Sequence, residues 1–484
     1  MSGSLIAIQS RYIIVGSGPG GSLAACLLAE AGEEVLVLEE GLEDAEFRIP
    51  PFSRPEMEEK YRNGGITMAF GRSRIQYIEG CCLGGGGEVN SGLYHRLPES
   101  IRERWQNRWQ VTGLDAISLE AFSLANEREL SVSFLPGEAP KPSSLLAEGA
   151  ASLGFYCVEA PRWQRYDVPE PGGKRQTMSA TMLPRAVKAG AIIRTDAKAV
   201  KITRGSGCWH VEAMTGIKRG EPKREIFTGQ KLILAAGAIQ TPVLLQRNRL
   251  GKRAGKFLQM HPTLKVTAVF PEEVNTLDMG VPVHQVKAFG TDMSMGCSIS
   301  SPHYLMASFK DTPGGAALVR DLWPRMASYY VMITPDKRGR VRALPGFKDP
   351  LVTFPLTYRD RTILSLGLKR LCEILFAAGT ESLYLSIKGM PPINSRAELG
   401  GIPQAVPPKE SELMTIHLTS SCPMSDDPAL GVTDSWGAVH GEENLYIADA
   451  GLLCTAPGVN PQGPLMAVVR RNVTHWLEQQ RKNP

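Results

Sequence analysis

The stretch Tyr12–Glu40, YIIVGSGPGGSLAACLLAEAGEEVLVLEE, decides the fold of this chain. A short apolar run over Tyr12–Val15 leads into a glycine-rich turn, and a run rich in Ala and Leu follows it. A second apolar run spans Val35–Leu38. This order predicts strand, turn, helix and strand within about thirty residues, which is the beginning of a parallel α/β unit.

The glycines of that turn follow the pattern G-x-G-x-x-G between a predicted strand and a predicted helix. We expect Gly16 to permit the tight turn, Gly18 to let the backbone approach a pyrophosphate, and Gly21 to allow close packing of helix on strand. The helix N-terminus then faces the phosphates. Glu39 follows the second strand directly, where a carboxylate accepts hydrogen bonds from a ribose diol. The pattern favours a dinucleotide site over a simple glycine-rich turn, but it does not choose between NAD and FAD.

Further segments repeat the alternation of strand and helix. A helix is predicted over Thr181–Ala189, strands within Ile192–Ile202 and at Lys231–Ala235, a helix at Thr241–Gln246 and a strand at Leu445–Ala448. We therefore predict an α/β chain, α+β overall, with a nucleotide-binding domain in three pieces, 8–100, 173–262 and 410–484. A second domain, 101–172 and 263–409, is inserted between them.

Composition excludes several classes of protein. The net charge of +5 over 484 residues gives no reason to expect nucleic acid as a partner. Nine scattered cysteines without metal-type spacing predict reduced thiols and no metal site. The N-terminal segment lacks a signal-peptide pattern, and the most apolar region, Thr362–Ile387, is interrupted by charges, as in an amphipathic helix. We expect a cytoplasmic protein without a transmembrane segment; the sequence says nothing of its oligomeric state.

Five segments, in order, carry a resemblance to a known family. These segments resemble the cofactor and catalytic segments of the glucose–methanol–choline (GMC) oxidoreductases, nearest to the cholesterol oxidase and long-chain alcohol oxidase branches. They are Cys82–Arg96, Lys231–Pro242, Gly255–Pro262, His417–Met424, and a closing segment made of Gly441–Asp449 and Pro457–Pro461. The resemblance implies a Rossmann-like FAD-binding domain and an inserted substrate domain built on a mostly antiparallel sheet. It also implies FAD contacts at Gly84, Gly85, Asn90, Ala236, Gly237, Asp449, Ala450 and Pro461. Asn90 would position the flavin through its side-chain amide.

The same resemblance pairs His417 with Asn460 as catalytic residues. Oxidation of an alcohol by hydride transfer to flavin N5 requires the hydroxyl proton to leave, and a neutral imidazole suits that proton. A second hydrogen-bonding side chain holds the oxygen as charge develops. We expect Pro461 to open a helix over Gln462–Arg471, whose N-terminus stabilises negative charge on the reduced flavin. The apolar stretch Ile363–Ala378 either walls a pocket for a hydrophobic alcohol or forms the core of its own domain. Oxygen or another acceptor then reoxidises the flavin.

Departures from the family pattern leave alternatives open. Glycines stand at positions 86, 87 and 451, Cys454 replaces a common Pro, and Pro464 replaces a common Thr. Val89 stands where some relatives attach FAD through a histidine, so we predict non-covalent FAD. We read His95, His261 and His440 as supporting residues. The alternatives are a GMC-fold flavoprotein with lyase or decarboxylase chemistry, a catalytically impaired FAD-binding protein, and an NAD-dependent dehydrogenase.

Overall fold

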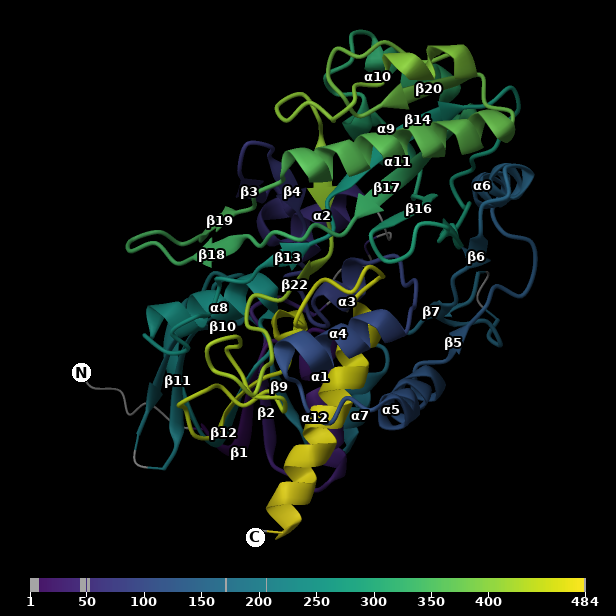
Figure 1. Cartoon of the computed structure of the whole chain (residues 1–484). Coiled ribbons are helices and arrows are strands. Elements are labelled where there is room, and N and C mark those ends of the chain that lie inside the picture. The colour runs from purple at the N-terminus through teal and green to yellow at the C-terminus, as the bar shows by residue number, and fades with distance from the viewer. Residues whose placement is uncertain (1–7, 44–48, 50–52, 170–171, 206, 483–484) are drawn as a thin grey trace.

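The computed structural model describes residues 8–43, 49, 53–169, 172–205 and 207–482. Two large sheets organise the chain, one in the lower and one in the upper part of Figure 1. A two-stranded ladder of β13 (Gln259–Met260) and β22 (Leu418–Thr419) lies where the chain passes between them. Among the described residues, no helix has the length and apolar character needed to cross a bilayer.

The lower sheet has seven strands in the order β10-β11-β12-β1-β2-β9, with β23 beside β12. Its strands are β1 (Ile8–Val15), β2 (Val35–Leu38), β9 (Ile192–Arg194), β10 (Ala197–Arg204), β11 (Trp209–Thr215), β12 (Lys223–Leu234) and β23 (Leu445–Ile447). The ladders that join β9, β2, β1, β12 and β23 are parallel, whereas β10 and β11 extend the sheet antiparallel. This is the parallel α/β unit that the glycine turn predicts.

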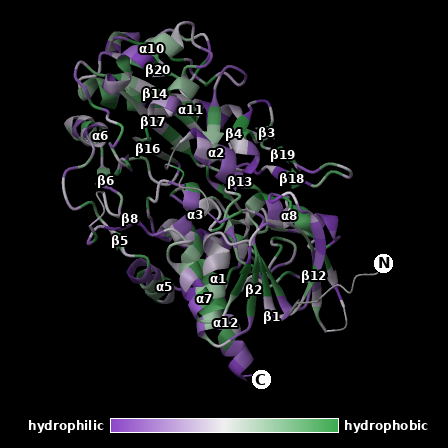
Figure 2. Cartoon of the chain, turned by 180° about the vertical axis from the view of Figure 1, so that it is seen from behind, coloured by the Kyte–Doolittle hydropathy of each residue, from purple (hydrophilic) through white to green (hydrophobic). Residues whose placement is uncertain are grey.

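Both faces of the parallel strands are buried. Tyr12 and Ile14 pack with α1 and α12, and Ile13 and Val15 pack on the opposite face. A strand covered on both faces reads as a continuous apolar run, which is why the run Tyr12–Val15 shows no polar alternation. In Figure 2, β1 and β2 are hydrophobic in colour, whereas the C-terminal end of α12 is hydrophilic.

Helices cover the two faces of this sheet. They are α1 (Pro19–Glu30), α3 (Gly86–Val89), α4 (Glu99–Trp109), α5 (Ala116–Glu129), α7 (Met182–Lys188), α8 (Gly237–Arg247) and α12 (Gln462–Lys482). The predicted helix at 181–189 is confirmed as α7, and the predicted strand at 445–448 as β23. Helix α12 is longer than the predicted 462–471.

The upper sheet has eleven strands in the order β18-β19-β3-β4-β21-β14-β17-β16-β15-β6, with β20 beside β14. They are β3 (Met68–Phe70), β4 (Ile75–Tyr77), β6 (Cys157–Glu159), β14 (Thr263–Val269), β15 (His284–Val286), β16 (Met293–Cys297), β17 (Met326–Ile333), β18 (Arg340–Arg342), β19 (Leu351–Thr353), β20 (Ser382–Leu385) and β21 (Leu413–Thr415). Only the β19–β3 and β4–β21 ladders of this sheet are parallel in the described chain, so it is mostly antiparallel, as predicted.

Helix α11 (Tyr358–Ala377) crosses the upper sheet (Figure 1) and buries Leu364, Leu368, Leu371 and Leu375 in its core. The stretch 363–378 therefore forms core and does not wall a pocket. The remaining helices of this part are α2 (Arg54–Lys60), α6 (Lys141–Ser152), α9 (Pro302–Ser308) and α10 (Gly315–Leu322). Short elements are β5 (Val132–Ser133), β7 (Arg162–Arg165) and β8 (Lys174–Arg175), with 3-10 turns η2 (Arg62–Gly65), η3 (Trp323–Arg325), η4 (Arg396–Gly401) and η5 (Ala450–Leu452).

The packing departs from the predicted domain division at several elements. Trp105 and Trp109 of α4 share the core of the lower sheet, and α5 packs on α12, although most of α4 and all of α5 fall in the segment 101–172 predicted for the second domain. Conversely, β3, β4 and β21 lie in segments predicted for the nucleotide-binding domain but belong to the upper sheet. The large apolar side chains of α4 bury their surface where the lower sheet offers an uncovered face.

Candidate active site

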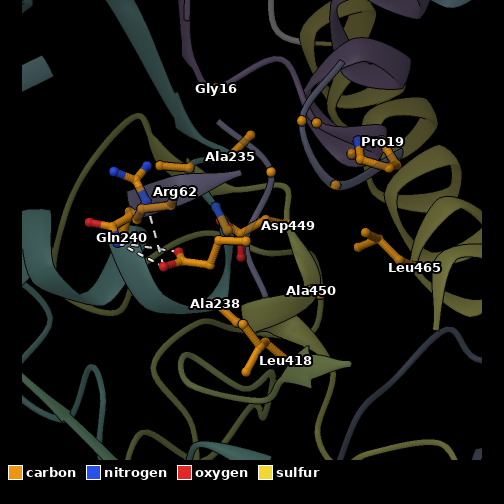
Figure 3. Close-up of a pocket in the computed structure, with 18 of the residues that line it drawn as sticks. Gly16, Pro19, Arg62, Ala235, Ala238, Gln240, Leu418, Asp449, Ala450 and Leu465 are labelled. Atoms are coloured by element: carbon orange, nitrogen blue, oxygen red, sulfur yellow. Dashed lines mark hydrogen bonds and ion pairs between the residues drawn. The ribbon is translucent and has the colours of Figure 1, made fainter. Parts of the chain in front are cut away.

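A long cleft lies over the carboxyl ends of the parallel strands β1, β2, β12 and β23. Most of the predicted site residues line it: Gly16, Gly18, Glu39, Gly85, Asn90, Ala236, Gly237, Asp449, Ala450, Pro461, His417 and Asn460. Two predicted residues, Gly21 and Gly84, lie behind its wall and not on it. Figure 3 shows Pro19 and Leu465 on one side of this cleft and Arg62 and Gln240 on the other. Segments from the whole length of the chain thus meet at one sheet edge.

The three glycines of the predicted motif differ in the space around each Cα. Gly16 has a φ of +102°, and a Cβ there would collide with the carbonyl oxygen of Ala235. A Cβ on Gly21 would collide with the carbonyl oxygen of Gly16, so this glycine lets α1 pack on the strand. A Cβ on Gly18 meets nothing within 4 Å, which leaves the backbone at this position open to the cleft. Gly20 is a further glycine, outside the motif, where a Cβ would collide with the carbonyl oxygen of Ala448.

The carboxylate of Glu39 ties this turn to its neighbours. Its Oε2 accepts hydrogen bonds from Ser17 N at 2.9 Å and Ser17 Oγ at 2.6 Å, and its Oε1 accepts from Gly41 N at 2.8 Å. The Ser17 hydroxyl oxygen in turn accepts from Gly84 N at 3.0 Å, so Gly84 holds the two loops together. Burial raises the pKa of Glu39, and the bonds from Ser17 and Gly41 oppose that shift. Carboxylate oxygens have further lone pairs, so Glu39 retains the capacity to accept from a ribose.

A charged network lines the same part of the cleft, and sequence reasoning missed it. Arg62 donates to both oxygens of Glu40, at 3.2 and 2.9 Å, and Lys198 donates to Glu40 Oε1 at 2.5 Å. Gln240 donates to the carboxylate of Glu79, which also faces Arg62. Burial would raise the pKa of Glu40, but Arg62 and Lys198 outweigh it and lower the pKa to about 2. No spacing rule links these residues, since they come from five separate segments.

Asp449 fixes the junction between β23 and α8. Its Oδ2 accepts from Gly237 N at 3.0 Å and Thr241 Oγ1 at 2.5 Å, and its Oδ1 accepts from Gly451 N at 2.7 Å. Burial raises the pKa of this carboxyl to about 6, against the pull of these donors. A Cβ on Gly451 would lie 2.7 Å from Asp449 Oδ1, so the glycine at this position suits the close turn.

The N-terminus of α12 also faces the cleft. The helix begins at Gln462 and not at Pro461, whose carbonyl accepts from Leu465 N at 2.9 Å. Pro461 therefore takes the cap position, one residue earlier than predicted. Pro464 lies in the first turn, where a backbone N–H has no partner within the helix. Asn90 donates to Gln462 Oε1 at 2.7 Å and accepts from Gly92 N at 2.8 Å, so its amide is fixed beside this helix end.

His417 and Asn460 lie side by side at the edge of the cleft. Asn460 Nδ2 lies 3.4 Å from His417 Nε2, and Asn460 Oδ1 accepts from Gln285 Nε2 at 3.4 Å. Gln285 also contacts His95 Nε2 at 2.8 Å, which makes His95 a support for the pair. Burial, then the nearby Lys287, lowers the pKa of His417 to about 3. Its imidazole is therefore neutral at pH 7, which a proton acceptor requires.

The other ring nitrogen of His417 contacts a second histidine. His417 Nδ1 lies 2.9 Å from His261 Nδ1, and His261 Nε2 accepts from Gly458 N at 3.1 Å. Because His261 Nε2 accepts, a neutral His261 carries its proton on Nδ1 and donates it to His417 Nδ1. The resting, neutral His417 then holds its own proton on Nε2, which leaves the Asn460 amide nitrogen 3.4 Å away as a contact and not as a hydrogen bond. His440 lies elsewhere and contacts the Ser425 carbonyl at 2.9 Å.

A second cavity, of about 400 Å³, adjoins the cleft. His417 and Asn460 line both spaces, together with Ile78, Ser91, Leu93 and Ile416. Much of the second cavity's wall is apolar and comes from the upper sheet and from loops beside it. The imidazole and the amide thus stand at the junction of the long cleft and the second cavity.

Comparisons with known proteins agree with this geometry. The family models for GMC oxidoreductases match residues 57–263 and 335–468, and that of an NAD(P)-binding Rossmann-like domain matches residues 14–43. The chain is 33% identical to the uncharacterized GMC-type oxidoreductase y4nJ of Sinorhizobium fredii, over 97% of this chain and 94% of the relative. It is 26% identical to the long-chain-alcohol oxidase FAO3 of Arabidopsis thaliana, over 96% and 67%.

Solved structures share the fold. A pyridoxine 4-oxidase from Mesorbium loti superposes with a TM-score of 0.73 at 19% identity, over 97% of this chain and 99% of the other. A formate oxidase of Aspergillus oryzae superposes with a TM-score of 0.75 at 14% identity, over 98% and 99%. With its fold, its ordered motifs and a relative at one-third identity over nearly its whole length, this chain belongs to the GMC oxidoreductase family.

Proposed function

We propose that this chain binds FAD non-covalently in the long cleft and oxidises an alcohol to a carbonyl compound, with His417 as base. One observation carries the proposal: His417 and Asn460, 3.4 Å apart, line both the cleft and the second cavity. A substrate in that cavity would place its carbinol carbon between these side chains and the cofactor. The alcohol oxidases among the relatives support the same reaction class.

The cleft fits a dinucleotide. Gly18 leaves open space where any other residue would place a Cβ, and the N-terminus of α1 begins beside it. Glu39 stands next to the turn with lone pairs available for a ribose, and Asn90 and Pro461 stand at the start of α12. The amides at that helix end would stabilise negative charge. Val89 offers no nucleophile for a covalent link.

When bound, FAD supplies the hydride acceptor at its N5 position. His417 takes the hydroxyl proton at Nε2, and Asn460 donates to the same oxygen from its Nδ2. To accept at Nε2, His417 must hold its own proton on Nδ1, facing His261. An alcohol whose hydroxyl donates to Nε2 favours this tautomer, at the cost of the bond from Gly458 to His261. That cost is about 1–3 kcal/mol for an unpaired buried donor.

The second cavity favours an alcohol with an apolar body. Leu93, Val281, Met332, Leu413 and Ile416 contribute to its wall. Apolar walls with a few polar groups are typical of small-molecule sites. We therefore propose a largely hydrophobic alcohol as the substrate, with oxygen or another acceptor taking the electrons afterwards.

The test is an absorbance spectrum of the purified protein before and after anaerobic addition of a panel of alcohols. We expect flavin bands that bleach with at least one alcohol. Flavin bands that no alcohol bleaches would contradict the oxidation and favour a non-oxidative or non-catalytic flavoprotein. A colourless protein that binds NADH would contradict FAD as the cofactor.

A further inference from the structure

A positively charged side chain that the proposed reaction does not use lines the second cavity. Two lysines line it, Lys265 and Lys310. Lys310 is largely exposed and pairs with Glu412 at 3.3 Å, so its charge is compensated. Lys265 extends from the middle of β14 and makes no hydrogen bond or ion pair with any residue that the structure describes. Only one of the two lysines therefore presents an unpaired ammonium group to this space.

The environment of Lys265 isolates its charge. Its ammonium lies 5.8 Å from the centre of the Tyr304 ring, and its partner on the neighbouring strand β17 is Tyr330. The side chain retains partial exposure although protein surrounds it, because the cavity is open beside it. Burial alone lowers the pKa of this amine to about 8, with no carboxylate near enough to oppose the shift. At pH 7 the group is mostly protonated, and a buried charge without a partner is unfavourable.

The position of Lys265 on β14 sets its distance from the histidine pair at the other end of the cavity. Thr263 and Lys265 alternate with buried residues on β14, so both lie on the cavity face of that strand, about 7 Å apart. Thr263 follows shortly after His261, which contacts His417. Lys265 therefore lies on the order of 10 Å from the imidazole pair, the length of a short alkyl chain.

We propose that the substrate is a hydroxy acid whose carboxylate pairs with the ammonium of Lys265 while its alcohol carbon lies at His417 and Asn460. A single ammonium beside the Tyr304 ring matches the single charge of a carboxylate. The apolar wall between Lys265 and His417 covers the hydrocarbon that joins the two groups. This inference rests on the proposed function and names the chemical class of its substrate.

Binding tests the inference without any turnover. Isothermal titration of the FAD-loaded protein compares hexanoate with its neutral analogue hexanamide. We expect hexanoate to bind about 10- to 100-fold more tightly, the usual weight of a hydrogen bond to a charged group. Lys265→Met should abolish that preference and Lys265→Arg should restore most of it. Removal of an unpaired buried charge favours folding of the Met variant.

A matched control removes one positive charge elsewhere. Lys388 is exposed and lies outside the cavity, so Lys388→Met should keep the preference for hexanoate. Equal affinity for hexanoate and hexanamide in the wild type, or an undiminished preference in Lys265→Met, would overturn the inference.

Turnover then separates this inference from the proposed function. Anaerobic flavin reduction is measured with ω-hydroxyhexanoate and with the neutral diol of the same length. We expect kcat/KM to favour the hydroxy acid by about 10- to 100-fold in the wild type and to be equal for the two in Lys265→Met. Reduction by the diol at an equal or higher rate would support alcohol oxidation and refute the role of Lys265. Binding of hexanoate that depends on Lys265, without reduction by either compound, would uphold the anion site and refute the oxidation.

Discussion

Two neighbouring glycines in the first turn should respond in opposite ways to the same added methyl group. Gly18 has φ −62° and ψ 179°, which alanine adopts without strain, and its Cβ would enter open cleft space. Gly18→Ala should therefore leave the FAD-free protein as stable as before, or more stable by about 0.4–1 kcal/mol through the unfolded chain. The methyl group would occupy the space left for the cofactor, so FAD affinity should fall about 5- to 150-fold, from about 1–3 kcal/mol of overpacking.

Gly20→Ala should act on the fold itself. Its Cβ would overlap the Ala448 carbonyl oxygen, a backbone atom at the end of β23 that cannot rotate away. Helix α1 would have to move off the sheet, at a cost of about 3 kcal/mol or more. Thermal unfolding of the FAD-free variants measures the change in stability, and titration with FAD measures the change in cofactor affinity. Equal losses of stability in both variants, or unchanged FAD affinity in Gly18→Ala, would refute this reading of the turn.

Three further predictions concern the imidazole pair. His417→Ala should retain FAD and lower the anaerobic rate of flavin reduction about 10²- to 10⁴-fold. Asn460→Ala should lower the same rate about 10²-fold. A variant that reduces the flavin as fast as the wild type would show that its residue takes no part in the reaction. Burial lowers the pKa of His417 to about 3, so the base stays deprotonated as the pH falls. Stopped-flow rates of flavin reduction should therefore stay constant between about pH 7 and pH 5. A fall in the reduction rate centred near pH 6.5, the ordinary pKa of histidine, would contradict this. Nitrogen NMR of the resting protein should show the proton of His417 on Nε2, because His261 donates to Nδ1; a proton on Nδ1 would exclude that arrangement.

The parallel half of the fold could be predicted because its signals are local. The glycine turn, the strands beside it and the carboxylate that follows β2 are specified within thirty residues of sequence. The inserted sheet has no such signal of its own, and its mostly antiparallel character was inferred from the family resemblance. Composition assigned the region of α4 and α5 to the second domain, whereas both helices pack with the lower sheet and its helices. Charge and tryptophan content do not reveal which sheet offers an uncovered face.

The candidate site could be predicted where motifs mark it and not where the fold assembles it. His417 and Asn460 lie in recognisable segments and do meet. The contact of His261 with His417 joins two segments far apart in sequence, and no spacing rule pairs them. Lys265 looks like any polar residue in a strand until the cavity beside it is known. The low pKa of His417 follows from burial, which only the packed structure determines.

The ladder of β13 and β22 places the histidine pair between the two sheets. His261 follows β13 and His417 precedes β22, at two of the points where the chain crosses from one sheet to the other. The two rings therefore lie at the seam between the two sheets. The separation of their facing nitrogens, 2.9 Å, is set by the packing of one sheet against the other and not by the local sequence around either histidine.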